Sequence, residues 1–355
     1  MQGILTLGGN QVREDLLKKY DAFWENKAID GPMLYLVVDK TPSDEGVSPQ
    51  KKWTDLDYRM ERFDNTDITY YGDAFPYIFS NLGPGSLSAC IGGDFVPAEH
   101  TIWFDQNPVL QDWDDLKNIR LDVNSEMWQL MVEYCRRLCE KGSCNVSIPD
   151  LGGTLDIIAS LRGTDTLLYD LYDHREEVLK SIDVVSDLWE YSYNLIVDLL
   201  AKYQKGTATW WPIWSRGRSF TLQCDFCAMI SPDMYRDFVH PHIKRQTEFL
   251  DNSTFHLDGQ GQIPHLDMLL SLPKLDAIQW VPGDGSPSTL DPCWHELYER
   301  IQRADKAVTL WCSSTEMDDY ERLLKRLDTK KAIFINCACN DEKEAEEMIR
   351  IAKLS

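Results

Sequence analysis

From residue 140 onward, short apolar segments alternate with longer amphipathic ones, and this alternation limits the possible folds more than any other feature of the chain. The apolar segments, which we interpret as strands, are NVSIPD, TATWWP, TFHLDG, AIQWV, AVTLWC and AIFINC. The segments between them carry apolar residues at helical spacing. Strands that alternate with helices over short connections form parallel sheets with crossover helices. The pattern predicts an α/β fold, and a (β/α)8 TIM barrel is its most economical form.

Two of the predicted helices carry clear start signals. The segment from Arg175 to Tyr203 has apolar residues at helical spacing, and its acidic start suits the positive end of the helix dipole. A second helix begins at Ser231, a good N-cap, and Pro232 suits the first helical position. Pro241 predicts a kink or a break within this second helix.

The N-terminal third has no sustained helical periodicity and is rich in aromatic residues, Gly and Pro. We expect it to contain the first barrel strand, preceded by an elaborated region that covers one mouth of the barrel. A chain of 355 residues, 43% of them hydrophobic, can bury a large core, and an α/β barrel uses this much chain as one domain. We therefore predict a single domain over 1–355, with an N-terminal elaboration at 1–80 and the barrel at 81–355.

The charge balance excludes several classes of partner. The chain has 36 Lys and Arg against 58 Asp and Glu, a net charge of −22, which disfavours nucleic acid and anionic membranes. No run approaches the roughly 20 apolar residues that span a bilayer. The start MQGILTLGGNQVRED lacks the pattern of a signal peptide, and the ten cysteines are scattered. These features predict a cytoplasmic protein with reduced thiols.

In a TIM barrel the chemistry lies at the C-terminal ends of the strands. His256 and Asp258 stand at one predicted strand end, two residues apart, so both side chains point to the same face. Cys337 and Cys339 repeat this spacing at the end of the last strand. If the two strand ends are neighbours, they form a metal site of imidazole, carboxylate and thiolate ligands. Other residues at predicted strand ends are Asp150, Trp210, Trp211, Asp284 and Cys312.

Further polar and aromatic residues near strand ends are candidates for catalysis and substrate binding. We expect Asp225, Asp258 and Asp284 to act in catalysis, and Asp150 to contact the substrate. Tryptophans near the mouth could form a platform for a sugar, an aromatic ring or a methylated ammonium group, although core packing explains them equally well. The remaining candidates for substrate binding are Trp210, Trp211, Trp214, Arg216 and Trp280.

Three segments resemble the uroporphyrinogen decarboxylase superfamily. They are IPDLGGTLDIIASLRGTDTLLYDLYDHREEVLKSIDVV, ISPDMYRDFVHPHIK, and HLDG with the cysteine-bearing last strand. Within the superfamily the chain looks most like the cobalamin-dependent methyltransferases, including the methylcobamide:coenzyme M type. The resemblance covers roughly residues 50–355 and is strongest after 147. It implies a TIM barrel of the uroporphyrinogen decarboxylase type.

The same resemblance implies a cofactor and a reaction. That branch holds zinc with a His-x-Cys pair and a Cys near the end of the last strand. His256 matches the His, Asp258 stands where the first Cys would be, and Cys337 or Cys339 lies near the second. The chain lacks the Asp-x-His-x-x-Gly motif of corrinoid carriers, so a corrinoid would come on a partner protein. The resemblance thus implies a zinc-dependent methyltransferase that exchanges a methyl group between a corrinoid protein and a small thiol or methylated compound.

Three other functions stay open. A uroporphyrinogen decarboxylase-like lyase fits less well, because the N-terminus lacks that activity's Arg-rich segment. A hydrolase for a sugar-like substrate could use two of the carboxylates at a Trp-rich mouth. A binding module without catalysis is disfavoured, because several ionisable groups gather at one predicted face. The sequence does not fix the oligomeric state, and a homodimer is compatible with it.

Overall fold

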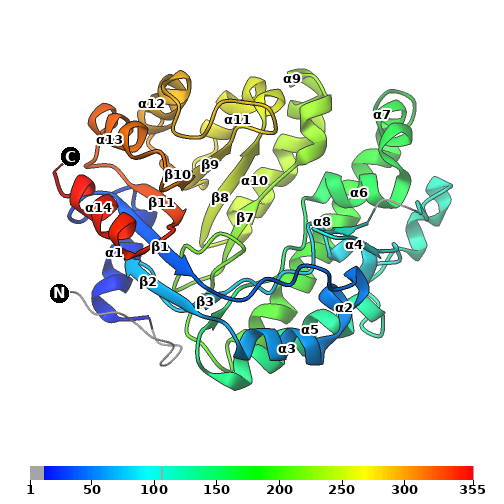
Figure 1. Cartoon of the computed structure of the whole chain (residues 1–355). Coiled ribbons are helices and arrows are strands. Elements are labelled where there is room, and N and C mark those ends of the chain that lie inside the picture. Colours follow the sequence, from blue (N-terminus) through cyan, green and yellow to red (C-terminus); the bar gives the residue numbers. More distant parts are fainter. Residues whose placement is uncertain (1–11, 105–106, 355) are drawn as a thin grey trace.

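The computed structural model describes residues 12–104 and 107–354, and its centre is a seven-stranded sheet (Figure 1). The strand order is β2-β1-β11-β10-β9-β8-β7, antiparallel between β1 and β2 and parallel elsewhere. The strands are β1 Met33–Asp39, β2 Ile68–Gly72, β7 Ser219–Leu222, β8 Asn252–Asp258, β9 Ala277–Val281, β10 Ala307–Ser313 and β11 Ile333–Ala338. The predicted α/β fold with a mostly parallel sheet is confirmed.

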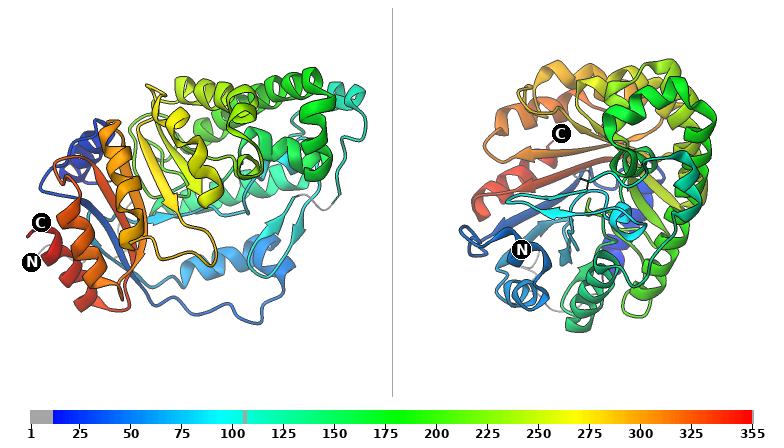
Figure 2. Two further views of the ribbon diagram at one scale, coloured as in Figure 1. Left: turned by 90° about the horizontal axis from the view of Figure 1, so that it is seen from above. Right: turned by 90° about the vertical axis from the view of Figure 1, so that its right-hand side faces the viewer.

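Helices join the successive parallel strands and cover one face of the sheet, as Figures 1 and 2 show. The helices that follow β7 in the chain are α9 Pro232–Met234, α10 His240–Phe249, α11 Leu266–Leu270, α12 His295–Arg303, α13 Met317–Arg326 and α14 Glu342–Ala352. A π-helical segment, Tyr235–Val239, connects α9 to α10 without a break. The irregularity that the sequence places at Pro241 is therefore a widened turn just before the proline, which relieves the clash that a proline ring makes in a regular helix.

The first 200 residues supply most of the remaining helices and four short strands. The helices are α1 Glu14–Trp24, α2 Pro49–Thr54, α3 Leu56–Asp64, α4 Leu87–Cys90, α5 Glu126–Lys141, α6 Thr154–Arg162, α7 Thr164–Asp173 and α8 Arg175–Leu200. The strands are β3 Tyr77–Ile78, β4 Val96–Pro97, β5 Ile102–Trp103 and β6 Asn145–Val146. Helix α8 confirms the long helix predicted from Arg175, and it ends three residues earlier than predicted.

Side chains on the two faces of the sheet belong to two separate cores. On the inner face, Tyr35, Ala277, Ala307 and Phe334 pack together with Phe75. On the outer face, the alternate residues pack against the helices in a larger cluster. The outer-face residues include Leu36, Leu257, Ile278, Leu310 and Ile335. Alternate residues of each strand therefore face either the inner core or the helices.

Short hydrogen-bonded segments lie between β2 and β7, the two edges of the sheet. β3 pairs in parallel with β6. The Ile148 amide beyond β6 donates to the Ala208 carbonyl at 2.8 Å. Thr209 then shares a hydroxyl–hydroxyl contact of 2.7 Å with Thr221 on β7. Hydrogen bonds thus run from β3 through β6 and the 207–209 segment to β7.

The structure corrects the interpretation of TATWWP. Within this segment Thr207 forms only an isolated antiparallel bridge with Ser215, because the chain turns back on itself. The strand that precedes the α9–α10 helices is β7, which is fully buried and was missed. In addition, β1 and β2, from the predicted N-terminal elaboration, are paired strands of the main sheet.

Within the described ranges no helix has both the length and the apolar character needed to cross a bilayer. The expectation of no signal peptide rests on residues 1–15, of which 1–11 lie outside those ranges.

Candidate metal centre

Three side chains with metal-binding atoms meet where β8 ends. His256 and Asp258 share the inner face of β8, and Asp225 begins the 3-10 helix η2 (Asp225–Met229) that follows β7. One ligand atom from each of the three lies within 4.8 Å of the other two. The His256 Nε2 and Asp258 Oδ2 atoms are 3.9 Å apart. The predicted His256/Asp258 pair is thus joined by Asp225, which the sequence suggested for catalysis.

A hydrogen bond to β9 orients the His256 ring. Its Nδ1 lies 2.8 Å from Oε1 of Gln279, which is almost completely buried. A carboxamide oxygen only accepts, so Nδ1 carries the proton and Nε2 keeps its lone pair, on the side of Asp258. Metal-binding histidines are usually oriented in this way by a hydrogen bond at the other ring nitrogen. The ring is therefore held in the tautomer that can bind a cation.

The electrostatics of Asp225 also favour a cation. Solvent reaches its side chain, yet protein surrounds most of the carboxylate. This desolvation raises the pKa of Asp225, Asp258 raises the pKa further, and His256 lowers it. Two carboxylates so close together repel each other, and a bound cation would relieve that repulsion.

A second pair of carboxyl groups lies behind Asp225. Burial is the main cause that raises the pKa of Asp150 to about 7, and the charge of Asp225 contributes in the same direction. Burial and the charge of Asp225 raise the pKa of Asp156 to about 7 as well. Asp150 Oδ1 accepts from the Gly152 amide at 2.8 Å, and Asp156 Oδ1 accepts from the Phe226 amide at 2.8 Å. Each of these two carboxyl groups therefore gains or loses its proton near neutral pH.

Replacing Asp150 with asparagine is expected to lessen the pH dependence of stability in metal-free protein, while the contribution of Asp156 remains. The carboxyl has a pKa of about 7 in the folded state and about 3.9 when unfolded, so the folded state holds the extra proton between these values. The free energy of unfolding then falls as pH rises from about 4 to about 7, by at most about 4 kcal/mol. Urea titrations with a chelator, at mildly acidic and mildly alkaline pH, measure this fall.

The matched control for this experiment is Asp284→Asn, since that carboxylate is exposed in the loop after β9. Asparagine at 150 can still accept from the Gly152 amide, so the variant should gain stability chiefly at alkaline pH. If Asp150→Asn and the wild type lose stability in parallel as pH rises, Asp150 does not hold the proton.

One tryptophan contacts the cluster, and a second stands two strands away. The ring of Trp210 meets the His256 ring edge to face, with centroids 4.9 Å apart. Trp311, on the inner face of β10, is 49% exposed. Leu257 and Leu310 both pair with Trp280, so Asp258 and Trp311 stand at the same level, two strands apart. At the usual spacing the two backbones are roughly 10 Å apart, with Val281 of β9 between them.

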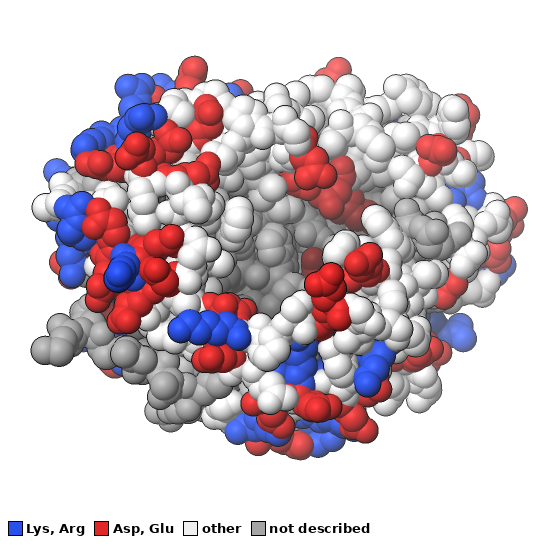
Figure 3. Space-filling view, viewed as in Figure 1, with Lys and Arg blue, Asp and Glu red and all other residues white. Residues whose placement is uncertain are grey.

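Most loops at the C-terminal ends of the parallel strands lack basic side chains, and the exception is the segment after β1, 40–48, which contains Lys40. No Lys or Arg occurs in the segments that follow β3, β6, β7, β8, β9, β10 and β11 up to the next helix: 79–86, 147–153, 223–231, 259–265, 282–294, 314–316 and 339–341. Figure 3 shows a face of the molecule that is hollowed near its centre and bordered by Asp and Glu. A neutral or positively charged molecule would approach this site more readily than an anion.

The two cysteines predicted as metal ligands lie elsewhere. Cys337 and Cys339 belong to the outer-face cluster, and their sulfur atoms are 3.9 Å apart. Cys339 also lies 4.0 Å from the sulfur of Met348 on α14. The alternation of β11 turns its neighbour Asn336 inward instead. The structure brings neither cysteine to the cluster of Asp225, His256 and Asp258.

The other predicted substrate-binding residues are scattered. Trp211 and Trp214 are buried in the inner core, and the Trp214 carbonyl accepts from Trp24 of α1 at 2.8 Å. Arg216 forms surface ion pairs with Asp21 and Glu14 of α1. Trp280 faces the helices, with its ring centroid 5.0 Å from that of Trp294. Of the predicted tryptophans, Trp210 is the one that contacts the cluster.

Sequence reasoning missed Asp156, Gln279 and Trp311. Gln279 and Trp311 each stand one residue from a residue that was proposed, Trp280 and Cys312. The signal that could have found them is the alternation of side chains along β9 and β10. Asp156 looks like an ordinary acidic residue in the first turn of α6.

The donor set fits zinc. One imidazole and two carboxylates give three protein ligands, which is typical of catalytic zinc sites that keep a position open for a substrate. The hydrogen bond from His256 to Gln279 supplies the usual outer-shell support. Zinc bonds of about 2.0–2.2 Å place tetrahedral ligand atoms about 3.3–3.6 Å apart, so carboxylates whose ligand atoms lie up to 4.8 Å apart would have to close on the ion by about 1 Å.

The protein shares its fold with a known enzyme structure. A methyltransferase from Methanosarcina mazei is similar, with a TM-score of 0.62 over 96% of this chain and 98% of that chain. The two sequences are 9% identical, so the likeness concerns the fold. No family model and no curated protein matches the sequence.

Proposed function

We propose that this protein is a zinc-dependent methyltransferase that moves a methyl group between a corrinoid on a partner protein and a small thiol. The observation that supports this most is the cluster of Asp225, Asp258 and His256, with its imidazole held in the metal-binding tautomer. The fold that the chain shares with a methyltransferase agrees with the proposal.

The residues of the cluster can be given roles in this reaction. A zinc ion held by His256, Asp225 and Asp258 would lower the pKa of a thiol so that it reacts as the thiolate. The proton that leaves the sulfur would go to solvent, which reaches the cluster at the exposed side chain of Asp225. The sulfur–methyl bond then forms as the cobalt–carbon bond breaks, and cobalt keeps the electron pair.

The charge of the site narrows the substrate to a neutral or cationic thiol. Two carboxylates balance a divalent metal, Asp150 and Asp156 are buried nearby, and the segments that follow β7 to β11 carry no cation to hold an acidic group. The exposed face of Trp311 suits an ammonium group through cation–π attraction. A thiol that bears an amine therefore fits better than one that bears a carboxylate or a sulfonate.

To test the proposal, the zinc-loaded protein is mixed with methylcobalamin and one of several thiols under anaerobic conditions. The absorbance of the corrinoid then reports its demethylation. We expect demethylation to be fastest with cysteamine, slower with mercaptoethanol, and slowest with mercaptoacetate, by roughly tenfold per unit of charge. Trp311→Ala should raise KM about two- to fivefold for cysteamine alone. The absence of demethylation with every thiol would contradict the proposal, and a preference for mercaptoacetate would contradict the assigned charge.

The charge of the site weighs against a uroporphyrinogen decarboxylase-like lyase. A porphyrinogen carries many carboxylates, and the segments that follow β7 to β11 offer no basic side chain to bind them.

We also propose that the sheet closes into a TIM barrel of the uroporphyrinogen decarboxylase type, through β3, β6 and the 207–209 segment. The hydrogen bonds that link these segments to β7 support closure. The corrinoid partner, the single domain and the cytoplasmic location belong to the same proposal. The described cysteines are all free, which suits a reducing compartment.

A further inference from the structure

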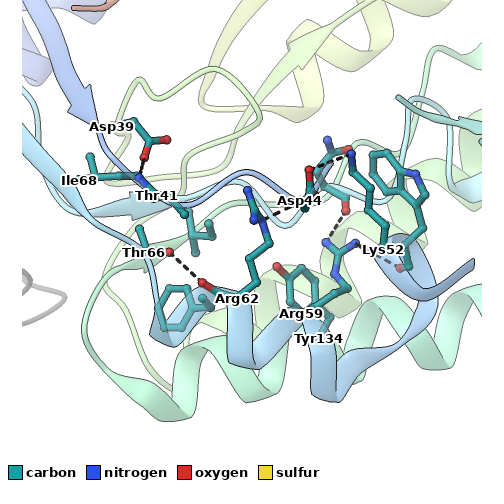
Figure 4. A pocket seen from close by; sticks show the side chains of 13 residues that line it. Asp39, Thr41, Asp44, Lys52, Arg59, Arg62, Thr66, Ile68 and Tyr134 are labelled. Atoms are coloured by element: carbon teal, nitrogen blue, oxygen red, sulfur yellow. Dashed lines mark hydrogen bonds and ion pairs between the residues drawn. The ribbon is translucent and has the colours of Figure 1, made fainter. Parts of the chain in front are cut away.

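A second cavity lies beside helices α2 and α3 and shares no residue with the metal cluster (Figure 4). Its volume is about 280 Å³. Three cationic side chains line it, Lys52 from α2 and Arg59 and Arg62 from α3, with Asp39 and Asp44 as the carboxylates. The cavity thus gathers basic groups on a protein whose net charge is −22.

Arg59 is a buried cation without a counter-ion. Its side chain donates to the carbonyls of Lys52, Trp53 and Asn81, at 3.4, 3.2 and 2.7 Å, and its guanidinium lies 4.0 Å from the centre of the Tyr134 ring. The residue is 9% exposed, its Nε has no hydrogen-bond partner, and no described carboxylate lies within ion-pair distance. A buried charge is unfavourable unless an opposite charge compensates it.

The other charges of the cavity do not supply that compensation. Asp44 is shared between Lys52 Nζ at 3.3 Å and Arg62 Nε at 3.7 Å. Asp39 turns toward its own loop, where it accepts from the Thr41 amide at 2.8 Å. Three positive and two negative side chains leave one positive charge without a partner.

We infer that this cavity binds a small monocarboxylate with an apolar body. A carboxylate matches the planar guanidinium of arginine and can accept two of its N–H groups. It also supplies the single negative charge that the cavity lacks, whereas a phosphate monoester carries about 1.5 to 2 at neutral pH. Apolar side chains line the rest of the cavity and would cover the body of the ligand: Trp53, Phe63, Ile68 and Ile78.

Isothermal titration calorimetry of the full chain with benzoate and with hexanoate tests the inference. We expect saturable binding of at least one of these probes. Benzyl alcohol, which lacks the charge, and inorganic phosphate, which lacks the apolar body, should not bind measurably at the same millimolar concentrations. Equal binding of benzyl alcohol would overturn the role of the charge. Binding of phosphate without either carboxylate would overturn the assigned ligand class.

Variants locate the binding. Arg59→Lys keeps the charge but loses the planar fork, and Arg62→Gln removes a charge from a partly exposed side chain, so the fold is least disturbed there. Each should weaken benzoate or hexanoate binding roughly tenfold. Arg322→Gln, which removes an exposed arginine on α13, is the matched control and should bind as the wild type does. Unchanged affinity in both cavity variants, or no binding of any carboxylate, would refute the inference.

Discussion

Replacing His256 with alanine is expected to abolish stoichiometric metal binding and to lower methyl transfer by at least about 100-fold, the upper end of the loss caused by removing an orienting partner. The imidazole is the one nitrogen donor of the cluster, and the two remaining carboxylates would repel each other without it. Metal analysis after dialysis and the methylcobalamin assay measure the two effects. His100→Ala, which removes an exposed histidine, is the matched control.

A variant that leaves the ligands in place separates metal binding from folding. Gln279→Leu keeps the size of the side chain but removes the acceptor that holds the proton on Nδ1 of His256. Metal affinity should fall about 10–100-fold. If His256→Ala and Gln279→Leu both keep the metal after dialysis, the cluster is not the metal site.

Much of the fold could be predicted from the sequence because strands buried by helices are short apolar runs with clear ends. β8, β9, β10 and β11 lie where such runs lie, and the helices between them begin close to the predicted positions. The 207–215 segment misled this reasoning, because it is as apolar as a strand but turns back at once. Only tertiary pairing distinguishes it from β7.

The candidate site was harder to predict because side chains alternate along a strand. A shift of one residue moves a side chain to the opposite face. His256 and Asp258 were placed correctly relative to each other, since residues two apart share a face in any register. For Trp280 and Cys337 the sequence did not show which face of the sheet each side chain is on, and both face the helices. Asp225 reaches the cluster from another strand end, which spacing along the chain does not reveal.

Replacing Gly153 with alanine is expected to destabilise the protein by about 3 kcal/mol, the upper part of the range for overpacking. Gly153 caps α6 with backbone angles that any residue adopts, φ −76° and ψ 146°, so no conformational strain arises. Its added methyl would instead overlap the main-chain oxygen of Gln223 and the Oδ2 of Asp156. The carbonyl belongs to the backbone beyond β7 and cannot rotate away, so α6 would have to move from the sheet end.

Thermal unfolding measures this effect, and a decrease in Tm of about 5–10 °C is expected. The control is Gly142→Ala at the C-cap of α5, where the space is open but φ is +64°, so only conformational strain of about 1 kcal/mol applies. Because α6 carries Asp156 and follows Asp150, its displacement should also alter the pH dependence of stability, which the control leaves intact. Equal losses in the two variants would mean that α6 tolerates the methyl, and that the end of β7 is not packed as tightly as the contacts of Gly153 indicate.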